Sequence, residues 1–219
     1  MRKSIKTGIL VAVLLVPVFL VFGLKFFGRN HYELRRMPNK EKFLTGEDGS
    51  IKSIPAFSLT DQDGKTFTQE QLKGKVVIAD FIFSRCETIC PKMTHELTRL
   101  QETFAGNKDV IIISHTVDPE FDSAAVLNSY AAQYGAKYGQ WYFLTGPKPV
   151  IYGLARDGYF LPVGKGDGGE TDFIHSDKVV LADKKGRIRG FYNGTDPVMV
   201  DTLILETRIL LQEQDNNGE

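Results

Sequence analysis

Apolar residues in this chain form short runs separated by polar stretches that contain glycine. Two mainly apolar runs, KVVIADFIF (residues 75–83) and DVIIISHTV (residues 109–117), predict strands that are buried on both faces of a sheet. QWYFLTG (residues 140–146) predicts a third strand. Alternating positions around a Gln-Asp-Gly turn predict a hairpin in IPAFSLTDQDGKTFT (residues 54–68). HSDKVVLADKKGRIRGFY (residues 175–192) predicts a second hairpin that turns at Lys185-Gly186.

Helical spacing of apolar residues follows several of these runs. Pro91 favours a helix start, and Met93, Leu97, Leu100 and Phe104 then recur on one helical face. Further helices are predicted for residues 122–135, 147–155 and 197–212, and a long Gly/Asp-rich loop for residues 156–174. Strands that alternate with helices, followed by a closing hairpin and helix, predict one α/β domain with a mixed central sheet flanked by helices.

The N-terminal part of the chain has a different pattern. Residues 8–27 carry a single charge, Lys25, and a helix of this length spans a hydrocarbon core of about 30 Å. A cleaved signal peptide is the alternative, but no small-residue cleavage site follows, so an uncleaved transmembrane helix is favoured. Basic residues flank the segment on both sides, and the positive-inside rule therefore does not choose an orientation.

These patterns divide the chain into five parts. We predict a short N-terminus (residues 1–7), a transmembrane anchor (residues 8–27), a polar linker (residues 28–50), a globular domain (residues 51–212) and a polar tail (residues 213–219). The 27 basic and 27 acidic residues balance. This balance argues against a nucleic-acid-binding protein, which would show a basic excess.

The only two cysteines, Cys86 and Cys90, lie between a predicted buried strand and a predicted helix start. The N–H groups and dipole of a helix N-terminus stabilise a thiolate, Arg85 adds a nearby cation, and Glu87 partly offsets it. Three interpretations stay open: a structural disulfide, a redox couple, or two soft ligands for Cu(I), zinc or an iron–sulfur cluster. Two sulfurs do not complete a tetrahedral metal site, so a metal needs another ligand.

The four histidines differ as candidates for that ligand. His31 lies in the polar linker and is expected to be solvated. His95 lies five residues after Cys90, which turns it away from the cysteine on a helix. His115 lies inside a predicted buried strand and is expected to be a hydrogen-bonded core residue. His175 opens a strand after the long loop, a place where sites gather in α/β sheets.

Three other features receive structural interpretations. Met93 is expected in the core rather than as a soft ligand, because it follows the helical spacing. Asp118 and Asp122 are expected to be turn and helix-cap residues. The segment GKGDGGETD lacks the ordered acidic spacing of a calcium loop.

Taken together, residues 55–212 resemble the Sco/SenC family of membrane-anchored, thioredoxin-like copper chaperones. The most specific motif is Phe83-x-x-Cys86-x-x-x-Cys90-Pro91 with His175 far downstream. Weaker motifs accompany it: Phe57-x-Leu59-x-Asp61-x-x-Gly64, Lys73-Gly74-Lys75, Val117-Asp118-Pro119 with Asp122, and Trp141-x-Phe143-Leu144-Thr145-Gly146. Glu87 departs from the family pattern, which commonly has proline after the first cysteine. This departure removes no ligand.

The resemblance implies a thioredoxin-like fold and a copper ion, Cu(I) or Cu(II), held by Cys86, Cys90 and His175. It also implies a role in assembling the dinuclear copper centre of cytochrome c oxidase. The implied partners are the copper-bearing oxidase subunit and an upstream copper donor. The implied location is the inner (cytoplasmic) membrane, with the domain on the periplasmic side. The alternative is a thiol–disulfide oxidoreductase acting through Cys86 and Cys90 on the oxidase cysteines or another extracytoplasmic partner. Reductases of the thioredoxin type usually carry Cys-x-x-Cys, so the extra residue between these two cysteines makes the reductase alternative less favoured.

Overall fold

The structure, a computed structural model, describes residues 15–16, 53–161 and 176–215. The chain forms two compact units, Met1–Glu33 and Leu34–Glu219, and the elements described below lie in the second. Within the described ranges no helix is long and apolar enough to cross a membrane. The predicted anchor falls outside these ranges apart from Leu15 and Val16, so it stays a prediction. The linker from residue 28 to residue 50 also lies outside them.

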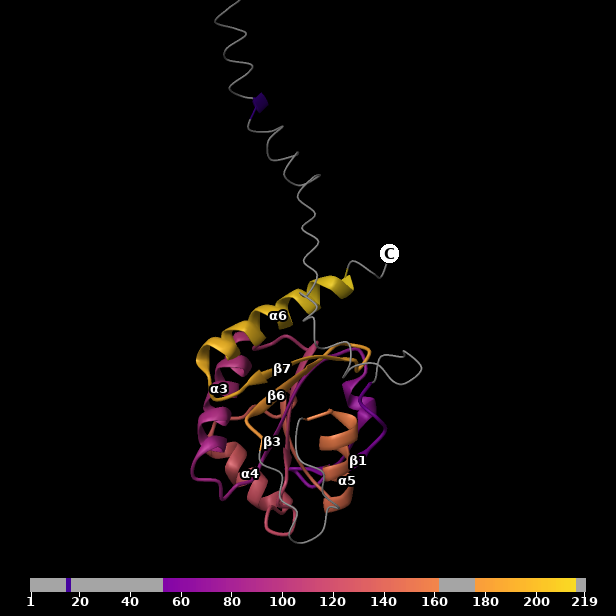
Figure 1. The fold of residues 1–219 in the computed structure, drawn as a ribbon, viewed down its shortest axis with the longest axis vertical. Coiled ribbons are helices and arrows are strands. Elements are labelled where there is room, and N and C mark those ends of the chain that lie inside the picture. Colours follow the sequence, from indigo (N-terminus) through magenta and orange to yellow (C-terminus); the bar gives the residue numbers. More distant parts are fainter. Residues whose placement is uncertain (1–14, 17–52, 162–175, 216–219) are drawn as a thin grey trace, which may run out of the picture. The chain divides into compact units, whose positions relative to one another are not determined.

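A seven-stranded sheet forms the centre of the domain (Figure 1), in the order β2-β1-β5-β4-β3-β6-β7. Strands β3, β4 and β5 are parallel to one another, and β1, β6 and β7 join them through antiparallel pairs. The mixed sheet predicted from the sequence is therefore confirmed. The strands are β1 (Ser58–Asp61), β2 (Thr66–Thr68), β3 (Val76–Ile82), β4 (Val110–Thr116), β5 (Trp141–Thr145), β6 (Lys178–Ala182) and β7 (Ile188–Asn193).

Helices cover both faces of the sheet. The helical elements are η1 (Gln69–Leu72), α3 (Ile89–Thr103), α4 (Ala124–Gln133), α5 (Lys148–Gly153), the π-helical turn η2 (Leu154–Gly158) and α6 (Pro197–Asp215). Helices α3, α4 and α6 pack on one face, and α5 with η2 packs on the other (Figure 1). Every residue of β3 and β4 is buried between these layers. This explains why their sequences read as continuous apolar runs rather than as alternating ones.

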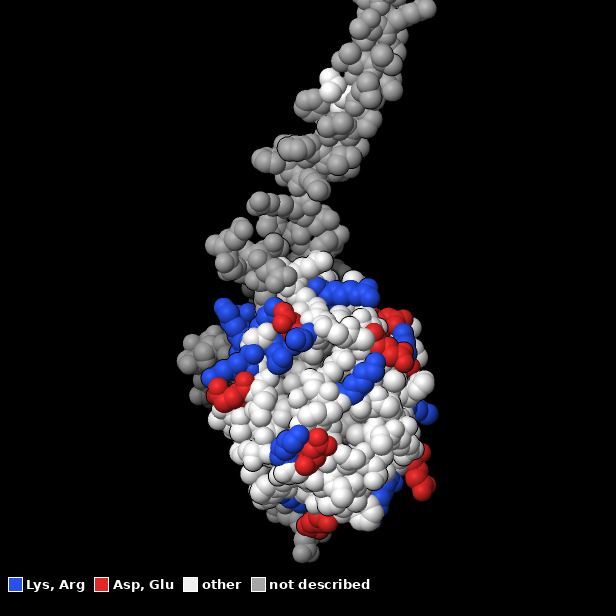
Figure 2. Space-filling model, turned by 180° about the vertical axis from the view of Figure 1, so that it is seen from behind, with Lys and Arg blue, Asp and Glu red and all other residues white. Residues whose placement is uncertain are grey.

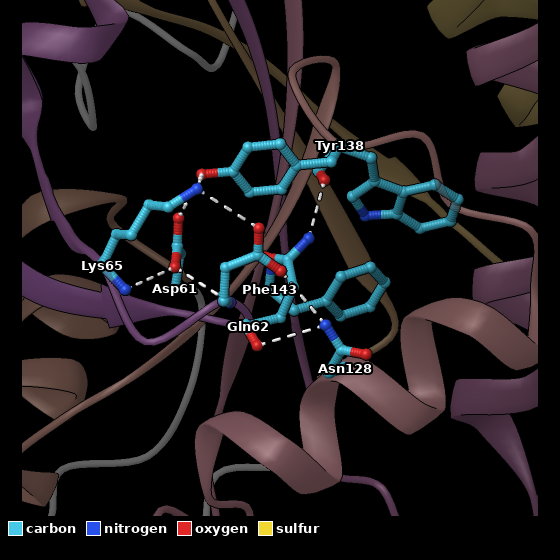
Figure 3. Close-up of polar contacts among 8 residues, drawn as sticks. Asp61, Gln62, Lys65, Asn128, Tyr138 and Phe143 are labelled. Atoms are coloured by element: carbon cyan, nitrogen blue, oxygen red, sulfur yellow. Dashed lines mark hydrogen bonds and ion pairs between the residues drawn. The ribbon is translucent and has the colours of Figure 1, made fainter.

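A polar network fastens the N-terminal hairpin to the rest of the sheet (Figure 3). The side chain of Gln62 donates to the Trp141 carbonyl at 3.2 Å and accepts from the Phe143 N–H at 2.9 Å. It thereby continues the pairing with β5 after β1 has ended. Asp61 accepts from the Tyr138 hydroxyl at 2.9 Å, and its other oxygen accepts from the Lys65 N–H at 2.8 Å. The hairpin is therefore held in place by side chains as well as by strand pairing.

Most predicted elements are present, with small shifts at their ends. The glycines of the two predicted hairpin turns, Gly64 and Gly186, have positive φ angles of 76° and 75°, which glycine adopts without strain. Helix α3 begins at Ile89 rather than at Pro91, so Cys90 lies inside its first turn. The predicted long loop is wrong at its start, because Leu154–Gly158 forms a helical turn. The remainder of that loop, from residue 162 to residue 174, lies outside the described residues.

Candidate metal centre

The cysteine loop leaves the sheet where two parallel strands end together. Ile82 at the end of β3 pairs with Thr116 at the end of β4. Ligand sites in open α/β sheets gather at this carboxyl edge. The Cys86 N–H then donates to the Phe83 carbonyl at 3.1 Å, which forms a tight turn directly after the strand. The fold thus delivers Cys86 to the sheet edge within a few residues.

The second cysteine lies in the first turn of α3. Its backbone N–H donates to the Cys86 sulfur at 3.4 Å. The N-cap residue, Thr88, makes no capping hydrogen bond to the helix with its side chain. The Cys86 sulfur therefore takes the place of a capping acceptor at the start of the helix. Cys86 is 8% exposed and Cys90 only 2% exposed, so solvent reaches the first sulfur more readily.

The two thiols have opposite pKa shifts. Burial raises the pKa of Cys86, but hydrogen bonds from the Cys90 thiol, the Cys90 N–H and Thr88 outweigh it, and the net pKa is lowered. Burial is the main cause that raises the pKa of Cys90, and the sulfur of Cys86 and the charge of Asp80 raise it further. Cys86 is consequently the thiol that ionises first. The prediction of a stabilised thiolate at a helix start is confirmed for Cys86, but Arg85 is not among its causes.

A buried carboxyl group lies beneath the same helix. Asp80 on β3 is 0% exposed. Its Oδ1 accepts from the Ser114 hydroxyl at 2.6 Å, and that hydroxyl accepts from the Trp141 indole N–H at 2.9 Å. Its other oxygen has no hydrogen-bond partner among the residues that the structure describes. Burial raises the pKa of Asp80 to about 7, and the bond from Ser114 only partly opposes this.

Two aspartates of the β4–α4 loop contact residues that precede Cys86. Asp118 forms an ion pair with Arg85 at 2.5 Å, and its carbonyl accepts two turn hydrogen bonds, so the predicted turn role is confirmed. Asp122 accepts from the Ser84 N–H at 3.0 Å. The predicted helix-cap role of Asp122 is wrong, because the cap of α4 is Ser123. The Asp122 side chain points toward the cysteine loop instead.

The structure describes two of the four histidines. His95 is exposed on α3, as predicted. His115 is 0% exposed and packs against aromatic rings, with Phe81 stacked at 4.8 Å. The expected hydrogen bonds of its ring are absent among the described residues, so that part of the prediction is wrong. Burial lowers the pKa of His115 to about 3. His31 and His175 lie outside the described residues.

Within residues 53–161 and 176–215, no third His, Cys, Asp or Glu completes a metal cluster. Met93 is 0% exposed and belongs to the core on the α3 face, as predicted. On the face of the molecule in Figure 2, basic side chains lie among acidic ones, consistent with the balanced composition. Among the described residues, the candidate metal ligands are therefore the two cysteine sulfurs, which suit a soft metal ion or thiol redox chemistry.

Sequence reasoning missed two parts of this site. Asp80 stands out as a charged residue in a run that reads as a buried strand, and that signal was visible in the sequence. The contact of Asp122 with Ser84 had no local signal, since the two residues are 38 positions apart and meet only through the parallel pairing of β3 with β4.

The fold and the site define a thioredoxin-like protein with a dithiol at the start of a helix. A sequence profile of the SCO1/SenC family matches residues 45–208. The chain belongs to this family.

Individual relatives agree with the family assignment. A SCO1 protein homolog of Bacillus subtilis (strain 168) is 40% identical over 157 residues, which cover 71% of this chain and 81% of that protein. The structure of BsSco, a member of the Sco family of cytochrome c oxidase assembly proteins with a disulfide switch, is 37% identical with a TM-score of 0.61. The match covers 73% of this chain and 93% of BsSco. Arabidopsis thaliana ScoI with copper bound is 28% identical with a TM-score of 0.56, covering 70% of this chain and 97% of that structure.

Proposed function

We propose that this chain is a copper chaperone that holds one copper ion through Cys86, Cys90 and His175 and assists assembly of the dinuclear copper centre of cytochrome c oxidase. The observation that carries the proposal is the hydrogen-bonded pair of sulfurs at the start of α3. Two thiolates are soft ligands that favour Cu(I), and an added imidazole also suits Cu(II). The copper-bound Arabidopsis relative and the oxidase-assembly relative BsSco support the same assignment.

The strand register supports His175 as the third ligand. Strand β6 runs antiparallel to β3, with Ala79 paired to Val180. Because the two strands run in opposite directions, residues that precede β6 approach the edge at which β3 ends. The described chain resumes at Ser176, which is 9% exposed. Ser176 thus precedes β6 on the side where β3 ends, which supports its neighbour in the sequence, His175, as the third ligand.

The ligand set is tested by histidine substitutions. In the full chain, His175→Ala should lower Cu(II) affinity by at least about 100-fold, since even residues that only support a ligand often account for about 10–100-fold. His95→Ala is the matched control, because this histidine is exposed on α3. The measurement is copper competition with a chromophoric chelator. Equal affinity in the His175→Ala variant and the wild type would remove the imidazole from the site.

The membrane and partner assignments belong to the same proposal. Residues 8–27 would anchor the chain in the inner membrane, with the domain facing the periplasm, where the copper-bearing oxidase subunit would receive the ion. An upstream copper donor would load it. Accessibility of an engineered tag at the C-terminus to a protease added to spheroplasts tests this orientation. Protection of the tag would contradict it.

A second function, thiol–disulfide exchange, is favoured by the asymmetry of the two thiols. Cys86 has a lowered pKa and is the more exposed sulfur, as an attacking thiolate requires. The disulfide switch of BsSco supports this candidate. His175→Ala separates the two functions. The variant should reduce a disulfide-bonded peptide at the wild-type rate, but it should no longer retain copper.

A further inference from the structure

The carboxylate of Asp122 is completely buried, and its hydrogen-bond partners lie where the parallel strands β3 and β4 end. The residue is 0% exposed. Its Oδ2 accepts from the Ser84 N–H at 3.0 Å and from the Thr116 hydroxyl at 2.5 Å. Its Oδ1 accepts from the Ser84 hydroxyl. Hydrogen bonds to an ionised carboxylate are about twice as strong as neutral ones. Ser84, two residues before Cys86, is therefore held firmly from the β4–α4 loop.

The same loop holds the next residue along the chain. Asp118 lies 2.5 Å from the Arg85 guanidinium, which also stacks over the ring of Phe121 at 4.0 Å from its centroid. Asp118 is itself fixed, since its N–H donates to the Thr116 hydroxyl at 3.0 Å. Two consecutive residues before Cys86 are thus fastened to a single loop.

The two sulfurs consequently depend on different supports. Cys90 moves with α3, whose inner face is buried against the sheet through Leu97 and Leu100. Cys86 lies before the helix, and the backbone that carries it is fixed by the contacts of Ser84 and Arg85. The 3.4 Å contact between the Cys90 N–H and the Cys86 sulfur depends on both supports. Loosening one support moves one sulfur relative to the other.

We propose that Asp122 is a positioning residue for the dithiol: its buried carboxylate holds the loop so that Cys86 stays against the first turn of α3. The copper part of this inference rests on the proposed function, whereas the sulfur geometry does not. Asparagine at this position has one acceptor oxygen in place of two. Its amide nitrogen can only donate, so at least one contact must reverse its direction, and the remaining contacts to Ser84 and Thr116 lose the charge of the carboxylate.

Asp122→Asn in the full chain, purified in a mild detergent, tests the inference with two readouts below the unfolding temperature. Affinity for Cu(I), measured by competition with a chromophoric chelator, should fall by about 10-fold or more. In copper-free protein, the dithiol–disulfide equilibrium in a glutathione redox buffer should shift toward the dithiol. The reason is that a displaced Cys86 thiol meets Cys90 less often.

Asp183→Asn provides the matched control. Asp183 is also 0% exposed and accepts hydrogen bonds from Lys185, Arg187 and Arg189, but it lies in the β6–β7 turn, at the opposite end of β6 from Ser176. This variant should lose stability while both readouts stay at wild-type values. Equal effects of the two variants, or no effect of Asp122→Asn, would overturn the positioning role.

Two further outcomes are interpretable. If Asp122→Asn does not fold, Thr116→Val keeps the side-chain shape but removes one donor to the carboxylate and the acceptor of the Asp118 N–H, and a smaller loss of the same kind is expected. Unchanged readouts in that variant would count against the inference. If the wild type binds no copper but the disulfide equilibrium still shifts, the proposed function fails and the positioning role stands.

Discussion

Replacement of Asp80 by asparagine should remove a large part of the pH dependence of folding stability. In the folded protein the pKa of this carboxyl is raised by burial to about 7, against an ordinary value of 3.8. Between these pH values the folded chain keeps a proton that the unfolded chain releases, so stability falls as pH rises. At about 1.4 kcal/mol per pH unit, the loss attributable to Asp80 between about pH 5 and about pH 8 is about 3 kcal/mol.

Urea unfolding followed by Trp141 fluorescence measures this effect. Trp141 is the only tryptophan and is 0% exposed, so its emission reports on the core beside Asp80. The free energy of unfolding of the wild type, relative to Asp80→Asn, should decline across that pH range. Asparagine keeps an acceptor for Ser114, so the shape of the site is retained. Parallel curves for the two proteins would contradict a buried titrating carboxyl.

His115→Phe is the control with the opposite sign. Burial lowers the pKa of His115 to about 3 from 6.5, so the unfolded chain binds a proton that the folded chain does not. Stability attributable to this residue is therefore lost as pH falls below 6.5. The phenylalanine variant should be less sensitive to acid than the wild type, whereas Asp80→Asn removes a loss of stability that develops as pH rises toward about 7.

The two cysteines should differ strongly in reactivity. In copper-free, reduced protein at neutral pH, we expect iodoacetamide to alkylate Cys86 at least about 100-fold faster than Cys90, because the thiolate is the reacting form. The lowered pKa of Cys86 and the raised pKa of Cys90 act in the same direction. Exposure adds to the difference, since Cys90 is only 2% exposed.

Mass spectrometry of peptides after timed alkylation gives both rates in one experiment. Urea-unfolded protein is the reference, because both thiols then lose the influence of the fold and should react at similar rates. A native-state ratio near that of the unfolded chain would contradict the assigned asymmetry. Faster alkylation of Cys90 would reverse the roles of the two thiols in the exchange reaction.

Much of the fold could be predicted from the sequence because local patterns and packing agree. The buried runs that became β3 and β4 are apolar on both faces, and the two hairpins turn at Gly64 and Gly186, as their sequences require. The cysteine motif was equally visible, since Cys86 and Cys90 flank a strand-to-helix junction.

The rest of the site depends on contacts between distant segments, which periodicity does not reveal. Asp122 has the sequence position of a turn or cap residue, yet its carboxylate bonds to Ser84, 38 residues away. His115 was correctly predicted to be buried, but its ring lacks hydrogen-bond partners in the described part of the chain because aromatic residues surround it. Arg85 was expected to act on the thiols, but Asp118 and Phe121 draw its guanidinium to the neighbouring loop.

Copper content and the absorption spectrum of the purified full chain, wild type beside Cys86→Ser and Cys90→Ser, test the central claim most directly. The proposal predicts about one copper ion per wild-type chain, a thiolate-to-copper charge-transfer band in the Cu(II) form, and the loss of both in each variant. A wild-type chain that retains no copper, or serine variants that retain it with an unchanged spectrum, would contradict a copper site built on this pair of sulfurs.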